Sequence, residues 1–126
     1  MTSPSLTVTL PWPDPVLNPN ARAHWIVERF AKRDAKKTAW ALVLQSMGRN
    51  WWAYRFTGTL DVSLIFHPPS SHRRDRDNCQ ASMKAAFDGI AGALSVDDTT
   101  FRPVSDWGPN TKGGKVVVTI TQRAPE

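Results

Sequence analysis

A change in hydrophobic period between residues 60 and 94 constrains the fold of this chain most strongly. Apolar side chains take alternate positions from Leu60 to Phe66, which is typical of a strand with one buried face. From Asn78 the spacing becomes helical, and one face gathers the apolar residues Cys79, Met83, Phe87, Ile90 and Leu94. The pattern therefore predicts a strand, the loop 67–71, and then one helix ending near residue 94.

The rest of the sequence predicts three more strands and one more helix. Leu6, Val8 and Leu10 alternate with threonines and form a short strand that ends at the prolines 11 and 13. A helix is expected from about residue 28 to 47, with the apolar positions Phe30, Trp40, Val43, Leu44 and Met47. The ranges 101–107 and 115–122 read as two strands joined by a hairpin loop over 108–114.

This order, β-α-β-α-β-β, predicts a single α+β domain over residues 1–126, with a mixed sheet packed against two main helices. A length of 126 residues suits one domain with a real core. A net charge of +5 moderately favours a polyanionic partner.

The single cysteine and the apolar segments limit the remaining possibilities. Cys79 cannot form an intrachain disulfide, is no basis for a zinc site, and lies on an apolar helix face, so we expect it in the core. The longest apolar run, residues 39–44, is far too short to span a bilayer, and the N-terminus has no apolar signal segment. We expect a cytoplasmic protein without a membrane anchor.

The segment after the strand at 60–66 carries the clearest chemical signal. Asp75 and Asp77 lie two residues apart among Arg73, Arg74 and Arg76. Neighbouring carboxylates repel one another, so this grouping favours a bound cation or phosphate. Mg²⁺ prefers such oxygen ligands, and Asp98 of the later Asp97-Asp98 pair would complete the site from the entrance of the next strand.

The basic residues around this segment have matching roles in cleavage of a phosphodiester. In one continuous helix Lys84 lies almost two turns after Asp77 and shares its face, where a lysine would offset charge in the transition state. Arg73, Arg74 and Arg76 would contact neighbouring phosphates. The sequence thus favours a metal-dependent nuclease.

Each feature also has a simpler interpretation. Asp77 with Gln80 could be a helix cap and its capping-box partner, and Asp97-Asp98 a polar turn. The six basic residues between positions 22 and 37 are more typical of a solvated helix face. The tryptophans are more often core residues than stacking platforms for bases, although Trp25 is a candidate for DNA contact.

In their order, several short blocks resemble the RusA-like family of Holliday junction resolvases. The blocks are Leu10-Pro11-Trp12-Pro13, Arg74-Asp75-Arg76-Asp77-Asn78, Lys84-Ala85-Ala86-Phe87-Asp88, Asp97-Asp98 and Thr111-Lys112-Gly113-Gly114. The resemblance implies a homodimer that binds a four-way DNA junction and makes paired cuts with Mg²⁺, for which Mn²⁺ can substitute. It also implies catalytic and metal-binding roles for Asp75, Asp77 and Asp98. Lys112 is a further DNA-binding candidate.

One departure from the family pattern concerns the lysine. The family's catalytic lysine follows the second aspartate by one helical turn, where this chain has Ala81, and Lys84 lies three residues further on.

Two other functions compete with a junction nuclease: a non-catalytic DNA-binding module whose aspartates only cap a helix, and a metal-dependent nuclease that acts on structured RNA.

Overall fold

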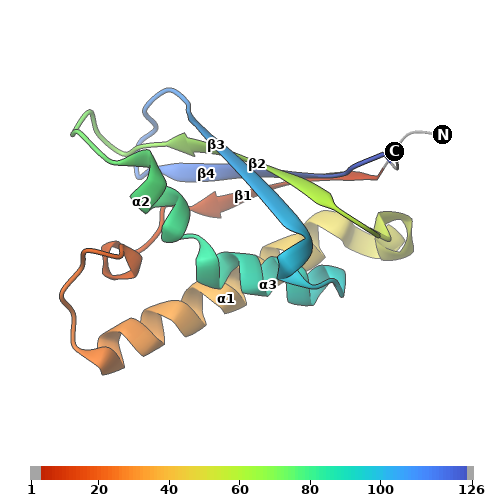
Figure 1. Ribbon diagram of the computed structural model, residues 1–126, viewed down its shortest axis with the longest axis horizontal. Coiled ribbons are helices and arrows are strands. Elements are labelled where there is room, and N and C mark those ends of the chain that lie inside the picture. Colours follow the sequence, from red (N-terminus) through yellow and green to blue (C-terminus); the bar gives the residue numbers. More distant parts are fainter. Residues whose placement is uncertain (1–3, 125–126) are drawn as a thin grey trace.

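Four strands form one mixed sheet in the computed structural model, which describes residues 4–124 (Figure 1). The strands are β1 (Ser5–Pro11), β2 (Leu60–His67), β3 (Phe101–Trp107) and β4 (Lys115–Gln122). The main helices are α1 (Trp25–Met47), α2 (Arg76–Ala81) and α3 (Lys84–Leu94), with short 3₁₀ turns at η1 (Pro15–Leu17), η2 (Gly48–Tyr54) and η3 (Asp98–Thr100). The predicted α+β class and element order are confirmed.

The strand order is β1-β4-β2-β3, which makes the predicted hairpin between the last two strands wrong. The chain leaves β3 and returns as β4 between β1 and β2, pairing antiparallel with both. β3 instead pairs parallel with β2 at the edge of the sheet, which requires a crossover connection, here formed by α2 and α3. β4 takes the centre because its valines and isoleucine are buried between two neighbours.

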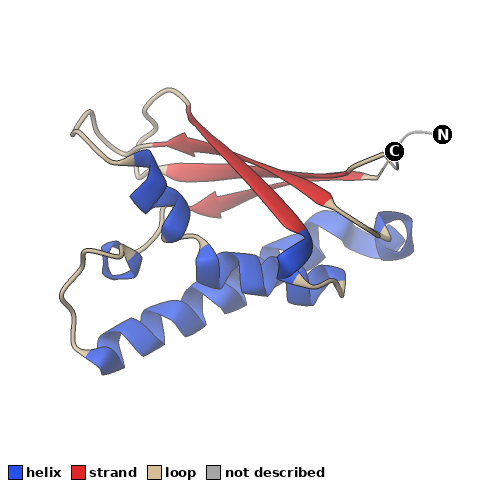
Figure 2. Ribbon diagram, viewed as in Figure 1, coloured by secondary structure: helices blue, strands red, loops and turns tan. Residues whose placement is uncertain are grey.

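The helices lie together on one face of this sheet (Figure 2). Alternate residues of each strand point to that face and form the core, among them Phe66, Leu64, Val118 and Ile120, which are fully buried. The opposite face carries small polar side chains, and Thr7 and Thr119 share a hydrogen bond of 3.1 Å there. Among residues 4–124, no helix combines the length and the apolar character that a membrane span requires.

Helix α1 packs through two alanines and through the predicted Val43 and Met47, but not through the aromatic residues expected from its spacing. Ala31, Ala39, Val43 and Met47 are buried, whereas Phe30, Trp40 and Leu44 are exposed. The small side chains let α1 approach α3 closely, and at Gly89 a Cβ atom would lie only 2.1 Å from the Lys36 carbonyl oxygen. Close contact between the helices thus overrides the simple hydrophobic pattern.

The expectation that the tryptophans belong to the core is also wrong for most of them. Five of the six have large exposed fractions. These are Trp25, Trp40, Trp51, Trp52 and Trp107. Trp12 packs against the core, where its ring meets Phe66 edge to face, and the half-exposed Trp107 contacts the same Phe66 ring.

The single helix predicted from residue 78 to 94 is broken into α2 and α3. At the junction the Met83 backbone N–H bonds to the Gln80 carbonyl, a tight 3₁₀ contact, and the Ser82 hydroxyl donates to the Asn78 carbonyl at 2.8 Å. Ser82 and Met83 are both buried. The break lets α2 follow the end of the sheet while α3 packs on α1.

Candidate functional site

Asp75 and Asp77 lie where the loop after β2 enters α2. The Asp75 carboxylate accepts hydrogen bonds from the backbone N–H groups of Asp77 at 2.8 Å and Asn78 at 3.2 Å. Asp75 is therefore the N-cap of α2, and the alternative interpretation of Asp77 as the cap is wrong. One oxygen of Asp75 makes both cap bonds, which leaves the other available to a ligand.

The Asp77 carboxylate is exposed and makes no hydrogen bond or ion pair with any of residues 4–124. It stands in the first turn of α2, where the helix dipole favours a negative charge. The two carboxylates thus share one exposed position at the end of β2. One of them is held by its cap bonds and the other is unpaired.

The three neighbouring arginines differ in their surroundings. Arg74 is half-buried, donates to the carbonyl oxygens of Ser70 at 2.8 Å and His72 at 3.0 Å, and lies over the Trp12 ring. These contacts make Arg74 a support of the loop before Asp75. Arg73 is exposed, and Arg76 forms a 3.4 Å ion pair with Asp106 at the end of β3.

The glycine-rich loop that carries Lys112 lies beside this segment. The Thr111 backbone N–H donates to the Pro68 carbonyl at 2.9 Å, and the Asn110 amide donates to the Ser71 hydroxyl at 2.7 Å. Gly114 closes the loop with φ 72°, and a Cβ there would lie 2.9 Å from Trp12 Cβ. The fold therefore joins the Lys112 loop to the loop before Asp75, although 38 residues separate Lys112 from Arg74 in the sequence.

Lys84 is exposed at the first position of α3. Because α2 and α3 are separate helices, Lys84 and Asp77 do not share one continuous helical face, and that prediction is wrong. Lys84 instead lines a groove between α1 and α3, to which Ala81 and Ser82 also contribute.

Asp98 lies at the other end of the paired strands β2 and β3 from Asp75 and Asp77. β2 runs parallel to β3, Asp98 precedes the start of β3, and Arg76 reaches Asp106 at its far end. Seven strand residues span about 23 Å. Within residues 4–124, no group of three or more His, Cys, Asp or Glu side chains is placed to hold one metal ion.

The surroundings of Asp98 are themselves acidic. A hydrogen bond to Asp88 is the main reason why the pKa of Asp98 is raised, and burial and the charges of Asp88 and Asp97 add to it. Asp97 caps η3 by accepting from the Thr99 backbone N–H at 2.9 Å, which lowers the pKa of Asp97. The Asp97-Asp98 pair thus forms a capped turn in this structure.

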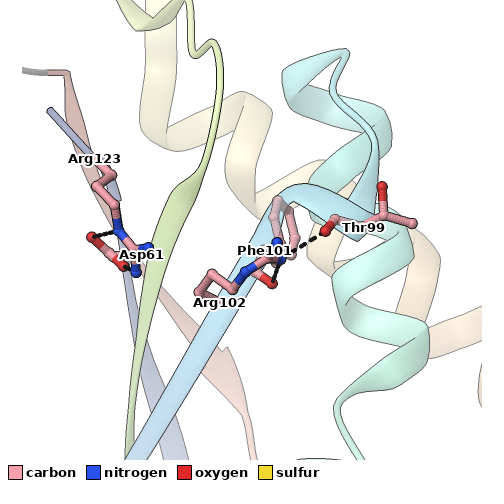
Figure 3. Close-up of polar contacts among 5 residues, drawn as sticks. All are labelled: Asp61, Thr99, Phe101, Arg102 and Arg123. Atoms are coloured by element: carbon pink, nitrogen blue, oxygen red, sulfur yellow. Dashed lines mark hydrogen bonds and ion pairs between the residues drawn. The ribbon is translucent and has the colours of Figure 1, made fainter. Parts of the chain in front are cut away.

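Polar contacts next to this turn hold the start of β3 (Figure 3). Arg102 donates to the carbonyl oxygens of Thr99 at 2.8 Å and Phe101 at 2.9 Å. On the neighbouring strand Asp61 pairs with Arg123, and this hydrogen bond lowers the pKa of Asp61. These groups stabilise the turn and the sheet end without facing Asp75.

Cys79 has the expected structural role. Its side chain is 9% exposed and belongs to the core cluster. Burial raises the pKa of its thiol, which disfavours the reactive thiolate.

A feature that the sequence did not reveal is the groove between α1 and α3. It has a volume of about 710 Å³ and is lined by the basic side chains Arg29, Lys32, Arg33, Lys36 and Lys84. The first four belong to the basic run that the sequence presented as a solvated helix face. Only the packing of α3 against α1 shows that they border a concave surface.

Comparison with known proteins gives a relative without an assigned function. No family model matches this sequence. The chain is 37% identical over 117 residues to an uncharacterized protein from Xylella fastidiosa, and the match covers 91% of this chain and 75% of that protein. This chain therefore belongs to the same family as that uncharacterized Xylella fastidiosa protein.

Proposed function

We propose that this protein is a Mg²⁺-dependent endonuclease that hydrolyses phosphodiesters in branched DNA and resolves four-way junctions by paired cuts. The observation that carries the proposal is the exposed carboxylate pair of Asp75 and Asp77, which lies at a sheet end among basic groups. The ordered motifs shared with RusA-like resolvases add the substrate class.

The carboxylate pair suits a magnesium ion that is shared with the substrate. Mg²⁺ is commonly held by one or two carboxylates together with phosphate oxygens and water. Asp75 has one oxygen outside its cap bonds, and Asp77 has both. When bound there, Mg²⁺ would polarise the phosphoryl oxygen and favour deprotonation of an attacking water. Mn²⁺ has similar ligand preferences and would substitute.

The chain's own groups position the phosphate. The cap bonds fix Asp75, because its carboxylate accepts two backbone N–H groups. Arg73 and Lys112 are exposed on the two loops beside it and would contact phosphates that flank the scissile bond. The role proposed for Lys84, which is to offset the charge that develops on the phosphoryl oxygens, rests on its exposure at the start of α3, three residues after the end of α2.

Paired cuts require two active sites related by a two-fold axis, and one copy of the chain has one such carboxylate pair. We therefore propose a homodimer, acting on DNA in the cytoplasm. Sedimentation at low and high salt tests this assembly, and a strict monomer with and without junction DNA contradicts paired cleavage.

The decisive experiment compares cleavage of a labelled four-way junction, its linear duplex and a structured RNA in Mg²⁺. We expect the junction to be cut and the Asp77→Asn variant to be inactive while still binding DNA. Asp34→Asn is the matched control, because Asp34 is also exposed and loses the same charge on α1. Normal turnover by Asp77→Asn refutes the metal site. Binding without cleavage by the wild type supports the non-catalytic module, and preferential RNA cleavage supports the RNA nuclease.

A further inference from the structure

We propose that the groove between α1 and α3 binds an unpaired nucleic-acid strand, with its phosphates on the basic side chains of α1 and one base on the Phe30 ring. This inference rests on the proposed function, since it names the part of a branched substrate that the protein holds next to the cleavage site. The groove has a volume of about 710 Å³, and residues 16–19 and Ala21 of the chain before α1 also line it.

The charge of the groove is strongly positive. Arg29, Lys32, Arg33 and Lys36 line one side from α1, and Lys84 lines the other from α3. These five cations outnumber the two acidic groups that line the groove. Glu28 pairs with Lys32 at 2.9 Å, and Asp88 shares a hydrogen bond with Asp98. The groove therefore keeps an excess of exposed positive charge, which is complementary to a phosphate backbone.

The spacing of the cations matches a short run of phosphates. Arg29, Arg33 and Lys36 are at positions i, i+4 and i+7 of α1, so they share one helical face. Seven residues of helix rise about 10 Å, so the row is long enough to contact more than one phosphate of a strand. This row can contact consecutive phosphates of one strand.

An aromatic ring lies within the same groove. Phe30 lines it and is 49% exposed, so one face of its ring is accessible to a ligand. The Arg33 guanidinium lies 4.8 Å from the centre of the ring, so the ring has cationic groups beside it. An exposed aromatic ring next to a basic row is the arrangement on which single-stranded nucleic acid stacks its bases.

The exposed aromatic ring favours a single strand over a duplex. Bases in a duplex are paired and stacked on one another, whereas the bases of an unpaired strand are free to stack on Phe30.

The groove also leads toward the proposed active site. Ala81 and Ser82, at the end of α2, line it beside Lys84. α2 begins one residue before Asp77, so a strand that leaves the groove past Lys84 runs along this short helix toward the carboxylate pair. An unpaired strand in the groove would thus place a neighbouring phosphodiester near Asp77.

The test is binding of a fluorescent oligothymidine, measured by anisotropy in EDTA so that cleavage plays no part. The double variant Arg29→Ala/Arg33→Ala removes two groove cations. Its matched control is Arg49→Ala/Arg55→Ala, which makes the same charge change on exposed arginines outside the groove. Two lost phosphate contacts should weaken binding about 25-fold at 0.1 M salt and reduce the salt slope by about 1.4. Equal weakening by both double variants overturns the proposal.

Phe30→Leu tests the stacking contact separately. Leucine keeps an apolar side chain at an exposed helix position but lacks the aromatic face, so folding should be unaffected, and circular dichroism checks this. We expect at least about fivefold weaker binding of the oligothymidine, the lower end for loss of one stacked base. Wild-type affinity in Phe30→Leu, or duplex binding as tight as single-strand binding, overturns the assignment of an unpaired strand.

The two proposals fail in different ways. Loss of binding in Arg29→Ala/Arg33→Ala, together with no cleavage of any substrate in Mg²⁺ or Mn²⁺, supports the groove and refutes the nuclease. Junction cleavage and oligothymidine binding at wild-type levels in the same double variant support the nuclease and refute the groove.

Discussion

Substitution of Gly89 by alanine probes the contact that holds α1 and α3 together. The added Cβ would lie 2.1 Å from the Lys36 carbonyl oxygen and 3.1 Å from the Trp40 backbone nitrogen. Both neighbours are backbone atoms of a long helix, so they cannot move aside as a flexible side chain can. α1 and α3 must therefore separate by more than 1 Å to reach an ordinary contact of about 3.5 Å.

The magnitude follows from two opposing effects. Overpacking of a close contact costs about 1–3 kcal/mol or more, and replacing a helical glycine by alanine returns about 1 kcal/mol. Because the overlap is with backbone, we expect the upper end of the cost and a net loss of about 2 kcal/mol in the free energy of unfolding. For a domain of this size that corresponds to a fall in Tm of about 8 °C.

Urea and thermal unfolding followed by circular dichroism measure this change. Gly92→Ala in the same helix is the control, because the nearest atom to its added Cβ is the Trp40 Cδ1 at 3.9 Å, an ordinary contact. We expect Gly92→Ala to be as stable as the wild type or more stable. If Gly89→Ala is also as stable as the wild type, the close approach of α1 to α3 is refuted.

Three further predictions concern chemistry and pH. Cleavage should require Mg²⁺ or Mn²⁺, with Ca²⁺ supporting binding but little turnover, and full activity in EDTA would exclude a metal mechanism. Lys84→Ala should lower the single-turnover cleavage rate at least about 100-fold but junction affinity only about fivefold, whereas Arg73→Ala should weaken binding alone. If Lys84→Ala loses rate and affinity equally, Lys84 is only a binding residue. The pKa of Asp98 is raised in the folded protein, chiefly by its hydrogen bond with Asp88. This interaction stabilises the fold at a pH below the pKa that Asp98 has in the unfolded chain, and the stabilisation is lost as pH rises through the pKa of Asp98 in the folded protein. Asp88→Asn should therefore raise Tm at neutral pH, and the gain should disappear in acid. Asp61→Asn should lower Tm at neutral pH and match the wild type in acid, because Arg123 lowers the pKa of Asp61 and the stabilisation is lost as pH falls through that pKa. Thermal unfolding across pH checks both signs, and parallel pH profiles for the two variants would contradict them.

The local elements could be predicted from the sequence because they depend on short-range periodicity. Alternation from Leu60 to Phe66 places every second side chain on one face, and the structure has β2 there. The separation of Asp75 and Asp77 by one residue likewise keeps both near the start of α2. These features need no knowledge of distant contacts.

The tertiary structure decided everything that depends on which elements meet. The insertion of β4 between β1 and β2, and not beside β3, depends on long-range pairing, such as that of Ser5 with Thr121, which local periodicity does not encode. The parallel pairing of β2 with β3 puts Asp98 at the opposite end of these strands from Asp75, although the sequence suggested that the two carboxylates converge. The basic run of α1 became the wall of a groove because Gly89 lets α3 approach the backbone of α1, a contact that no periodicity in either helix encodes.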